Sequence, residues 1–117
     1  MNPVSTEVSP EILQKTKDGW RIAAPSAQPG GGMFAVVADW CGHCKTLKST
    51  VAQAQRNKPF DFFYMTGDKT NDHKTKSQQL GVEGFPTTYF IGRNGVLFPY
   101  NGARSVPAFN ELFSSKY

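Results

Sequence analysis

The chain has 117 residues, which is enough for one compact domain and too few for two ordinary ones. Hydrophobic residues make up 38% and charged residues 19%, a balance that allows a modest core and argues against intrinsic disorder. Thirteen Lys and Arg against nine Asp and Glu give a net charge of +4, scattered without a block of like charges, so we expect no nucleic-acid partner.

The sequence carries no pattern typical of a membrane span or of a secretory signal. The longest apolar run, residues 33–38, is far shorter than a membrane span, and we expect no membrane partner. Residues 1–7 contain neither the basic nor the apolar stretch of a secretory signal. The expectation is an oxidising compartment (the ER lumen or the periplasm) if a signal was removed, and otherwise the cytoplasm.

The first predicted elements are a helix and a strand. Ser9 with Pro10 is typical of a helix start, and Gly19 is typical of its end. Residues 20–23 then predict a short edge strand, and the glycine-rich residues 29–32 predict a flexible loop. Residues 33–38 are apolar at every position, which is typical of a strand covered on both faces at the centre of a sheet.

The next segments alternate between helix and strand. From residue 41 to 56 the apolar positions fall at three- and four-residue spacing, which predicts a helix with one buried face: Cys44, Leu47, Val51 and Ala54. Residues 60–65 are rich in aromatic side chains and predict a second buried strand. Residues 72–80 predict a helix capped by Gly81.

The C-terminal part predicts a hairpin and a last helix. Residues 87–91 form a strand, Arg93-Asn94-Gly95 favours a tight turn, and residues 96–98 return antiparallel, with Pro99 placing them toward an edge. Ser105 caps a helix whose apolar face contains Phe109, Leu112 and Phe113. From residue 33 the order is βαβαββα, an α/β fold around a mixed sheet.

The two cysteines, Cys41 and Cys44, carry the functional signal. They are too few for a disulfide framework, and a bridge across so short a loop removes little unfolded-state entropy. Cys41 falls at the N-terminus of a predicted helix, where unpaired N–H groups and the helix dipole favour a thiolate, so we expect an exposed, reactive thiol. Cys44 lies one turn further on, placed to attack a mixed disulfide formed at Cys41.

Zinc binding and a purely structural cysteine pair are the alternatives. Two Cys and two His satisfy the arithmetic of a four-ligand zinc site. However, a helix start would turn His43 away from the cysteines on either side of it, and His73 lies in a polar stretch typical of a solvated surface. We therefore expect no metal.

The hexapeptide Trp40-Cys41-Gly42-His43-Cys44-Lys45 resembles the active-site motif of the thioredoxin superfamily, and its Gly-His pair resembles the catalytic domains of protein disulfide isomerases. Residues 84–87 resemble the cis-proline loop of that family, residues 90–95 its terminal hairpin, and residues 100–104 a segment that carries an arginine. The resemblance covers roughly residues 33–117. It implies a thioredoxin fold, α/β with a mixed central β-sheet flanked by helices, in one domain over residues 1–117. Residues 1–32 would supply the N-terminal helix, an edge strand and the loop.

The resemblance also implies a chemistry. It is that of a thiol–disulfide oxidoreductase that forms, isomerises or reduces disulfides in protein substrates, without a metal or organic cofactor. Cys41 would attack and Cys44 would resolve the mixed disulfide. His43 would favour an oxidant or isomerase over a reductase, and Arg104, if it is not a solvated surface arginine, would assist Cys44.

A substrate surface is implied beside the cysteines. Trp40, unless it is a simple core tryptophan, would form part of it. A cis peptide before Pro86, where an ordinary proline would be trans, would set the Phe85 backbone beside the sulfurs, where it could pair with an extended client. The implied partners are protein dithiols and disulfides, together with glutathione or an upstream redox protein, and we expect a monomer.

One departure from the family pattern concerns proton transfer. The family carries a buried Asp or Glu six residues before the first cysteine, where this sequence has Ala35. The lysine that partners this acid on the next buried strand of the family is missing too, because the equivalent region here is Phe63-Tyr64-Met65. Asp39 is close in sequence, but we expect its side chain to point elsewhere. The departure keeps open a client-binding or assembly module with little redox turnover, and a dedicated reductase is a further alternative.

Overall fold

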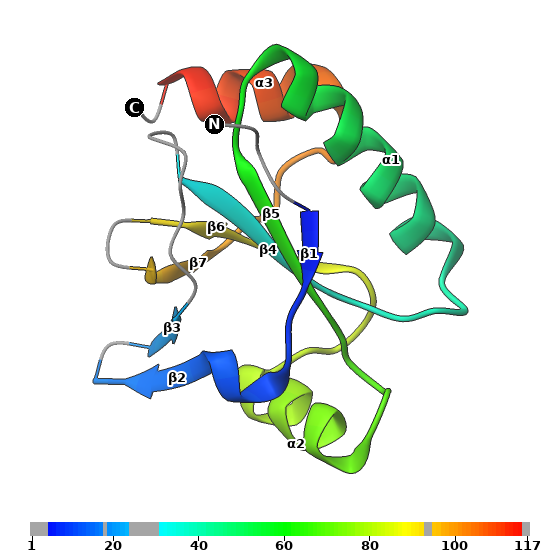
Figure 1. The fold of residues 1–117 in the computed structure, drawn as a ribbon, viewed down its shortest axis with the longest axis vertical. Helices are drawn as coiled ribbons and strands as arrows, with labels where there is room; N and C mark the ends of the chain where they lie inside the picture. The colour runs from blue at the N-terminus through cyan, green and yellow to red at the C-terminus, as the bar shows by residue number, and fades with distance from the viewer. Residues whose placement is uncertain (1–4, 18, 24–30, 93–94, 116–117) are drawn as a thin grey trace.

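A five-stranded mixed sheet forms the centre of the computed structural model, which describes residues 5–17, 19–23, 31–92 and 95–115 (Figure 1). The strand order is β1-β5-β4-β6-β7. The bounds are β1 Ser5–Glu7, β4 Gly32–Val37, β5 Asp61–Thr66, β6 Thr87–Ile91 and β7 Leu97–Pro99. β1, β5 and β4 run parallel, whereas β6 and β7 pair antiparallel. The expected mixed sheet is confirmed.

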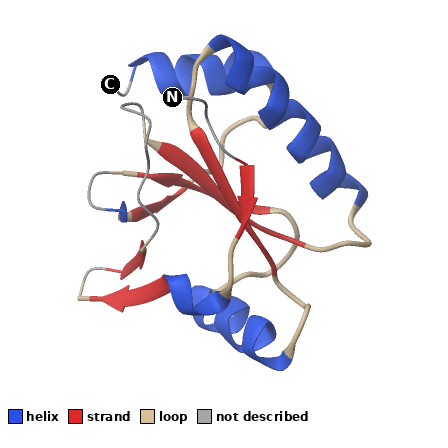
Figure 2. Ribbon diagram, in the orientation of Figure 1, coloured by secondary structure: helices blue, strands red, loops and turns tan. Residues whose placement is uncertain are grey.

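Helices cover both faces of this sheet (Figure 2). α1 (Gly42–Asn57) and α3 (Val106–Ser115) pack together on one face, and α2 (Asn71–Leu80) lies on the other. Every residue of β4 is buried, and its side chains alternate between two apolar clusters, one on each face. The prediction of a central strand covered on both sides is therefore confirmed.

The two helices that flank β5 also follow their predictions. The buried residues of α1 are the four that the spacing predicted: Cys44, Leu47, Val51 and Ala54. α2 ends at Gly81, whose φ of 81° is the left-handed conformation that favours glycine at a helix C-terminus.

The N-terminal prediction was wrong. Instead of a helix from Ser9 to Gly19, a single 3-10 turn, η1 (Pro10–Ile12), leads into β2 (Leu13–Thr16), which pairs antiparallel with β3 (Gly19–Ile22). The register brings Leu13 opposite Ile22, and both are buried. A hairpin buries this pair against the sheet, and that tertiary gain overrides the local helix signals. The expected strand at residues 20–23 exists as β3.

The hairpin of β2 and β3 is also fastened to α2. The ammonium of Lys76 lies 5.0 Å from the centroid of the Trp20 ring, and that of Lys15 lies 5.3 Å from it. Lys76 Nζ also donates to the carbonyl of Leu13 at 3.3 Å. These contacts join the N-terminal segment to the face of the sheet opposite α1.

The C-terminal elements agree with the sequence. β6 and β7 pair with Ile91 opposite Leu97, and β7 is at the edge of the sheet. The expected tight turn falls on residues 93–95, of which 93 and 94 lie outside the described residues. In α3, the Oγ of Ser105 accepts the Ala108 N–H at 3.3 Å, and Phe109 and Phe113 are buried.

Candidate active site

Cys41 occupies the N-cap of α1, at the point where the chain leaves β4. Its Sγ accepts a hydrogen bond of 3.2 Å from the Cys44 N–H, one of the helical donors that otherwise lack a partner. The same Sγ lies 3.6 Å from the carbonyl oxygen of Phe85, to which the thiol donates. A sulfur held between one donor and one acceptor has a defined position before any client binds.

Both cysteines are buried. Cys41 is 5% exposed and Cys44 is 1% exposed, so the expectation of an exposed Cys41 was wrong, although Cys41 is the more accessible of the two. The physical reason is the N-cap geometry, because accepting the Cys44 N–H turns the sulfur inward and toward Phe85. A disulfide that comes within reach of Cys41 must therefore approach close to the Phe85 backbone.

The thiol of Cys44 resists ionisation. Burial, together with the hydrogen bond and the charge of Cys41, raises the pKa of the Cys44 thiol from its ordinary 9.0 to about 11. A backbone hydrogen bond at Ala38 and the positive charge of Lys48 lower the pKa of Cys44 in part. Cys44 is thus a neutral thiol near pH 7, a poor nucleophile until a step makes it ionise.

Trp40 lies beside the cysteines on the surface rather than in the core. It is 71% exposed. Its indole N–H donates to Asp68 Oδ2 at 2.7 Å, and its ring meets that of Phe85 edge-on at 5.7 Å between centroids. The large exposed ring is therefore fixed in place. Asp68, its anchor, carried no signal in the sequence, because the two residues are 28 positions apart.

The loop before β6 completes this surface. The peptide bond between Phe85 and Pro86 is cis. The half-buried Phe85 ring packs against the apolar clusters on both faces of the sheet, while its carbonyl faces Cys41. The structure therefore brings together four of the residues that the sequence singled out: Trp40, Cys41, Cys44 and Phe85.

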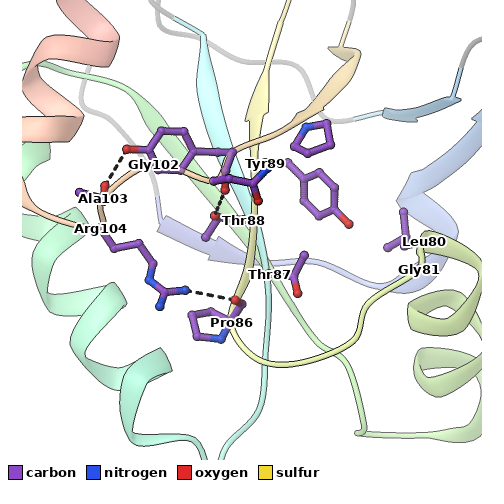
Figure 3. A pocket seen from close by; sticks show the side chains of 12 residues that line it. Leu80, Gly81, Pro86, Thr87, Thr88, Tyr89, Gly102, Ala103 and Arg104 are labelled. Atoms are coloured by element: carbon purple, nitrogen blue, oxygen red, sulfur yellow. Dashed lines mark hydrogen bonds between the residues drawn. The ribbon is translucent and has the colours of Figure 1, made fainter.

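Arg104 is exposed and lies next to the same loop. Its Nη1 donates to the carbonyl oxygen of Pro86 at 3.3 Å, across one end of a pocket (Figure 3). The turn that carries it is held by two bonds, from Thr88 Oγ1 to the Tyr100 carbonyl at 2.9 Å and from the Tyr100 hydroxyl to the Ala103 carbonyl at 2.6 Å. The arginine thus contacts the Pro86 loop.

Ala35 lies beneath the cysteines. It is fully buried in the same apolar cluster as Cys41 and Cys44, and it stands opposite Tyr64 in the pairing of β4 with β5. Asp39 is exposed. The cation that acts on Cys44 is Lys48, which the sequence reading did not single out, although its position four residues after Cys44 on a helix was visible.

The two histidines lie near the N-terminal ends of two different helices. His43 is exposed on the first turn of α1, and His73 is near the start of α2, where its Nδ1 lies 2.6 Å from Thr70 Oγ1. Within the described ranges, no group of three or more His, Cys, Asp or Glu is placed to hold a metal ion. In the same residues, no helix has the length and apolar character needed to cross a membrane.

Comparison with known proteins relates the chain to thioredoxin-like proteins. The thioredoxin family model matches residues 32–114. Protein disulfide-isomerase of Datisca glomerata is 36% identical over 78 residues, covering 64% of this chain and 15% of its own length. Protein disulfide-isomerase tigA of Aspergillus niger is 31% identical over 88 residues, covering 72% of this chain and 24% of its own length.

Among solved structures, the Trx4 domain of ERdj5 superposes with a TM-score of 0.59 at 16% identity, over 97% of this chain and 96% of that one. This match supports the fold. The chain spans less than a quarter of the length of either curated relative, so the likeness is to one domain of those proteins. The chain therefore belongs to the thioredoxin family, as a domain related to the protein disulfide isomerases, and so to a family of thiol–disulfide oxidoreductases.

Proposed function

We propose that this domain exchanges disulfides with protein clients, with Cys41 as the attacking sulfur and Cys44 as the resolving sulfur. The observation that supports this assignment best is the position of Cys41 Sγ. It is within hydrogen-bonding distance of the Cys44 N–H and of the Phe85 carbonyl, at 3.2 Å and 3.6 Å. A client sulfur that reaches Cys41 would therefore lie beside a main-chain acceptor.

The proposed reaction has two steps. In the first, the Cys41 thiolate attacks one sulfur of a client disulfide, an S–S bond forms between client and protein, and the other client sulfur leaves as a thiolate that takes a proton from solvent. In the second, Cys44 loses its proton to solvent and attacks Cys41. The Cys41–Cys44 bond forms, the client's remaining sulfur leaves as a thiolate and is protonated, and the client is reduced by two electrons.

The reverse sequence oxidises a client dithiol, and the two sequences combined on one client isomerise its disulfides. Client recognition would use the exposed Trp40 ring and the Phe85-Pro86 backbone. When Cys41 is a thiolate or is disulfide-bonded, it no longer donates to the Phe85 carbonyl, which then becomes available to a client N–H. No metal or organic cofactor takes part in these steps.

Turnover assays test this function. The domain should catalyse the reduction of insulin by a dithiol and the refolding of reduced ribonuclease in a glutathione buffer. Cys41→Ser should abolish both activities. Cys44→Ala should retain attack but lose release, so its insulin turnover should fall to the background rate.

A client-binding module with little redox turnover is the second candidate, and one observation favours it. The position beneath Cys44 is occupied by Ala35, so no carboxylate there can accept the Cys44 proton. Because the pKa of Cys44 is also raised, forming its thiolate in the resolving step costs free energy. That candidate predicts binding of unfolded protein by the wild type and by Cys41→Ser alike, with neither insulin reduction nor ribonuclease refolding above background. Measuring all three properties on the same preparations separates the two.

A further inference from the structure

A lysine on α1 follows the resolving cysteine by one helical turn. Lys48 comes four residues after Cys44, so the two side chains share a face of the helix. It is half-buried, unlike Lys45 on the same helix, which is exposed. Because Lys48 lies against the sheet rather than in solvent, its charge is screened less and acts more strongly on neighbouring groups than the charge of a surface lysine does.

The ammonium of Lys48 is held in place by an aromatic ring. Its Nζ lies 4.2 Å from the centroid of the Tyr64 ring on β5, a close cation–π contact. Tyr64 stands opposite Ala35 in the strand pairing and packs against the cluster that contains both cysteines. The charge is therefore fixed beside the layer in which Cys44 is buried.

The other surroundings of Cys44 are apolar or neutral. In its cluster, β4 contributes Ala35 and Val37, and α3 contributes Phe109 and Phe113. The titratable or charged groups that face the layer are Cys41 from the N-cap, Lys48 from α1, Tyr64 from β5 and Tyr100, which follows β7. His43 and Lys45 on the same helix are exposed. Of these groups, Lys48 supplies the positive charge that acts on the Cys44 sulfur.

We propose that Lys48 is a positioning residue for the resolving step, whose fixed ammonium charge favours the Cys44 thiolate as the client is released. The inference rests on the proposed function. During resolution the proton of Cys44 passes to solvent, and Lys48 neither takes it nor forms a bond. Its role is to offset the negative charge that develops on a buried sulfur, for which the described residues supply no second cation that lowers its pKa.

Isolated resolution of a mixed disulfide tests the role of Lys48. Glutathione is attached to Cys41 at about pH 4, where Cys44 remains a thiol, and release of glutathione is followed by rapid mixing and acid quench after a jump to higher pH. The variants are Lys48→Met and Lys48→Gln, which remove the charge, and Lys48→Arg, which retains it. Arg56→Met makes the same change in net charge at an exposed site in the last turn of α1.

We expect release near neutral pH to slow about tenfold in both neutral variants, because loss of the positive charge raises the pKa of Cys44. The pH profile of release should move upward, whereas release by Lys48→Arg and Arg56→Met should stay within about twofold of the wild-type rate. In a Cys44→Ala background, the rate at which Cys41 attacks glutathione disulfide should not change with Lys48→Met. A merely structural role would alter attack and release together and leave the pH profile in place.

The proposal is overturned if Lys48→Met and Lys48→Gln release glutathione as fast as the wild type. It is equally overturned if Arg56→Met slows release as much as they do. A wild type that forms the mixed disulfide but does not release it overturns the proposed function, and this inference with it. Urea unfolding of each variant shows beforehand that the fold is retained.

Discussion

The Cys44 N–H donates to Cys41 Sγ at 3.2 Å, so the backbone of the proposed resolving residue supports the sulfur of the proposed attacking residue. The support is asymmetric. Cys41 gains a hydrogen-bond donor at the start of a helix, whereas burial and the presence of Cys41 both keep Cys44 neutral. In the exchange that we propose, Cys41 therefore reacts first, and Cys44 becomes reactive only after the mixed disulfide has formed.

The raised pKa of Cys44 predicts a loss of stability at high pH. A thiol whose folded-state pKa, about 11, exceeds its ordinary 9.0 contributes stability that is fully present below pH 9.0 and is lost as the pH rises toward 11. The loss for the reduced protein should be about 2–3 kcal/mol. Denaturant unfolding of reduced wild type and of Cys44→Ala across this range measures it.

The comparison with Cys44→Ala isolates this thiol. Burial also raises the pKa of Tyr89 and Tyr100, so both proteins should lose stability at high pH from these phenols, and the difference in slope reports Cys44. Parallel slopes in the two proteins would mean that Cys44 ionises as easily in the folded chain as in the unfolded one.

His43→Pro should make the Cys41–Cys44 disulfide less oxidising. An imidazolium charge on the first turn of α1 favours a thiolate at Cys41 and hence the reduced form, and the substitution removes it. His43 is exposed and proline is tolerated in the first helical turn, so the fold should be retained. We expect the potential to fall by tens of millivolts, on the order of 1–3 kcal/mol. Equilibration with glutathione buffers measures the potential, and an unchanged value would remove the argument for an oxidant.

Ala35→Glu should destabilise the fold and speed resolution. The side chain is fully buried in the cluster that contains both cysteines, so a carboxyl there should cost about 1–3 kcal/mol of unfolding free energy. A desolvated carboxyl can also accept the Cys44 proton near neutral pH, so release of a mixed disulfide should be faster. Ala52→Glu makes the same change on the exposed face of α1 and should do neither. If Ala35→Glu releases its client no faster than the wild type, the missing acid is not the bottleneck.

Gly67→Ala should destabilise the fold and crowd the Phe85 ring, which belongs to the surface that we propose for client recognition. A Cβ at Gly67 would lie 2.7 Å from Val36 Cγ1, 2.8 Å from Phe85 Cε1 and 2.8 Å from Ser77 Oγ. These side chains, which include the Phe85 ring, or the backbone at Gly67 must shift, at a cost of about 1–3 kcal/mol. Gly84→Ala is the matched control, because a Cβ there meets no atom within 4 Å. Urea unfolding checks the prediction, and equal stability of the two variants would contradict it.

Local patterns in the sequence were sufficient for the core of the fold and for the reactive pair. The apolar run of β4 and the spacing of Cys44, Leu47 and Val51 each reflect burial within one element, which is why both were read correctly. The N-cap position of Cys41 follows from the same two elements, because it lies where the strand gives way to the helix.

Features that depend on contacts between residues far apart in the sequence could not be predicted from local patterns. The segment after Ser9 carried helix signals, but its structure is decided by the pairing of Leu13 with Ile22. β1 has three exposed residues with no alternating pattern, and it is held by pairing with β5 and by a bond from Thr66 Oγ1 to Glu7 Oε2 at 3.1 Å. The anchoring of Trp40 by Asp68 likewise has no local signature.

Trapping a mixed disulfide tests the central claim most directly. Cys44→Ala and Cys41→Ser are each incubated with a peptide that contains one disulfide, and the covalent adducts are mapped by mass spectrometry under acid conditions. Cys44→Ala should accumulate the peptide on Cys41, because attack proceeds and resolution does not. Cys41→Ser should accumulate little adduct near neutral pH, because Cys44 is buried and remains a neutral thiol. Adduct formation on Cys44 at a rate equal to that on Cys41, or no adduct on either, would contradict the account.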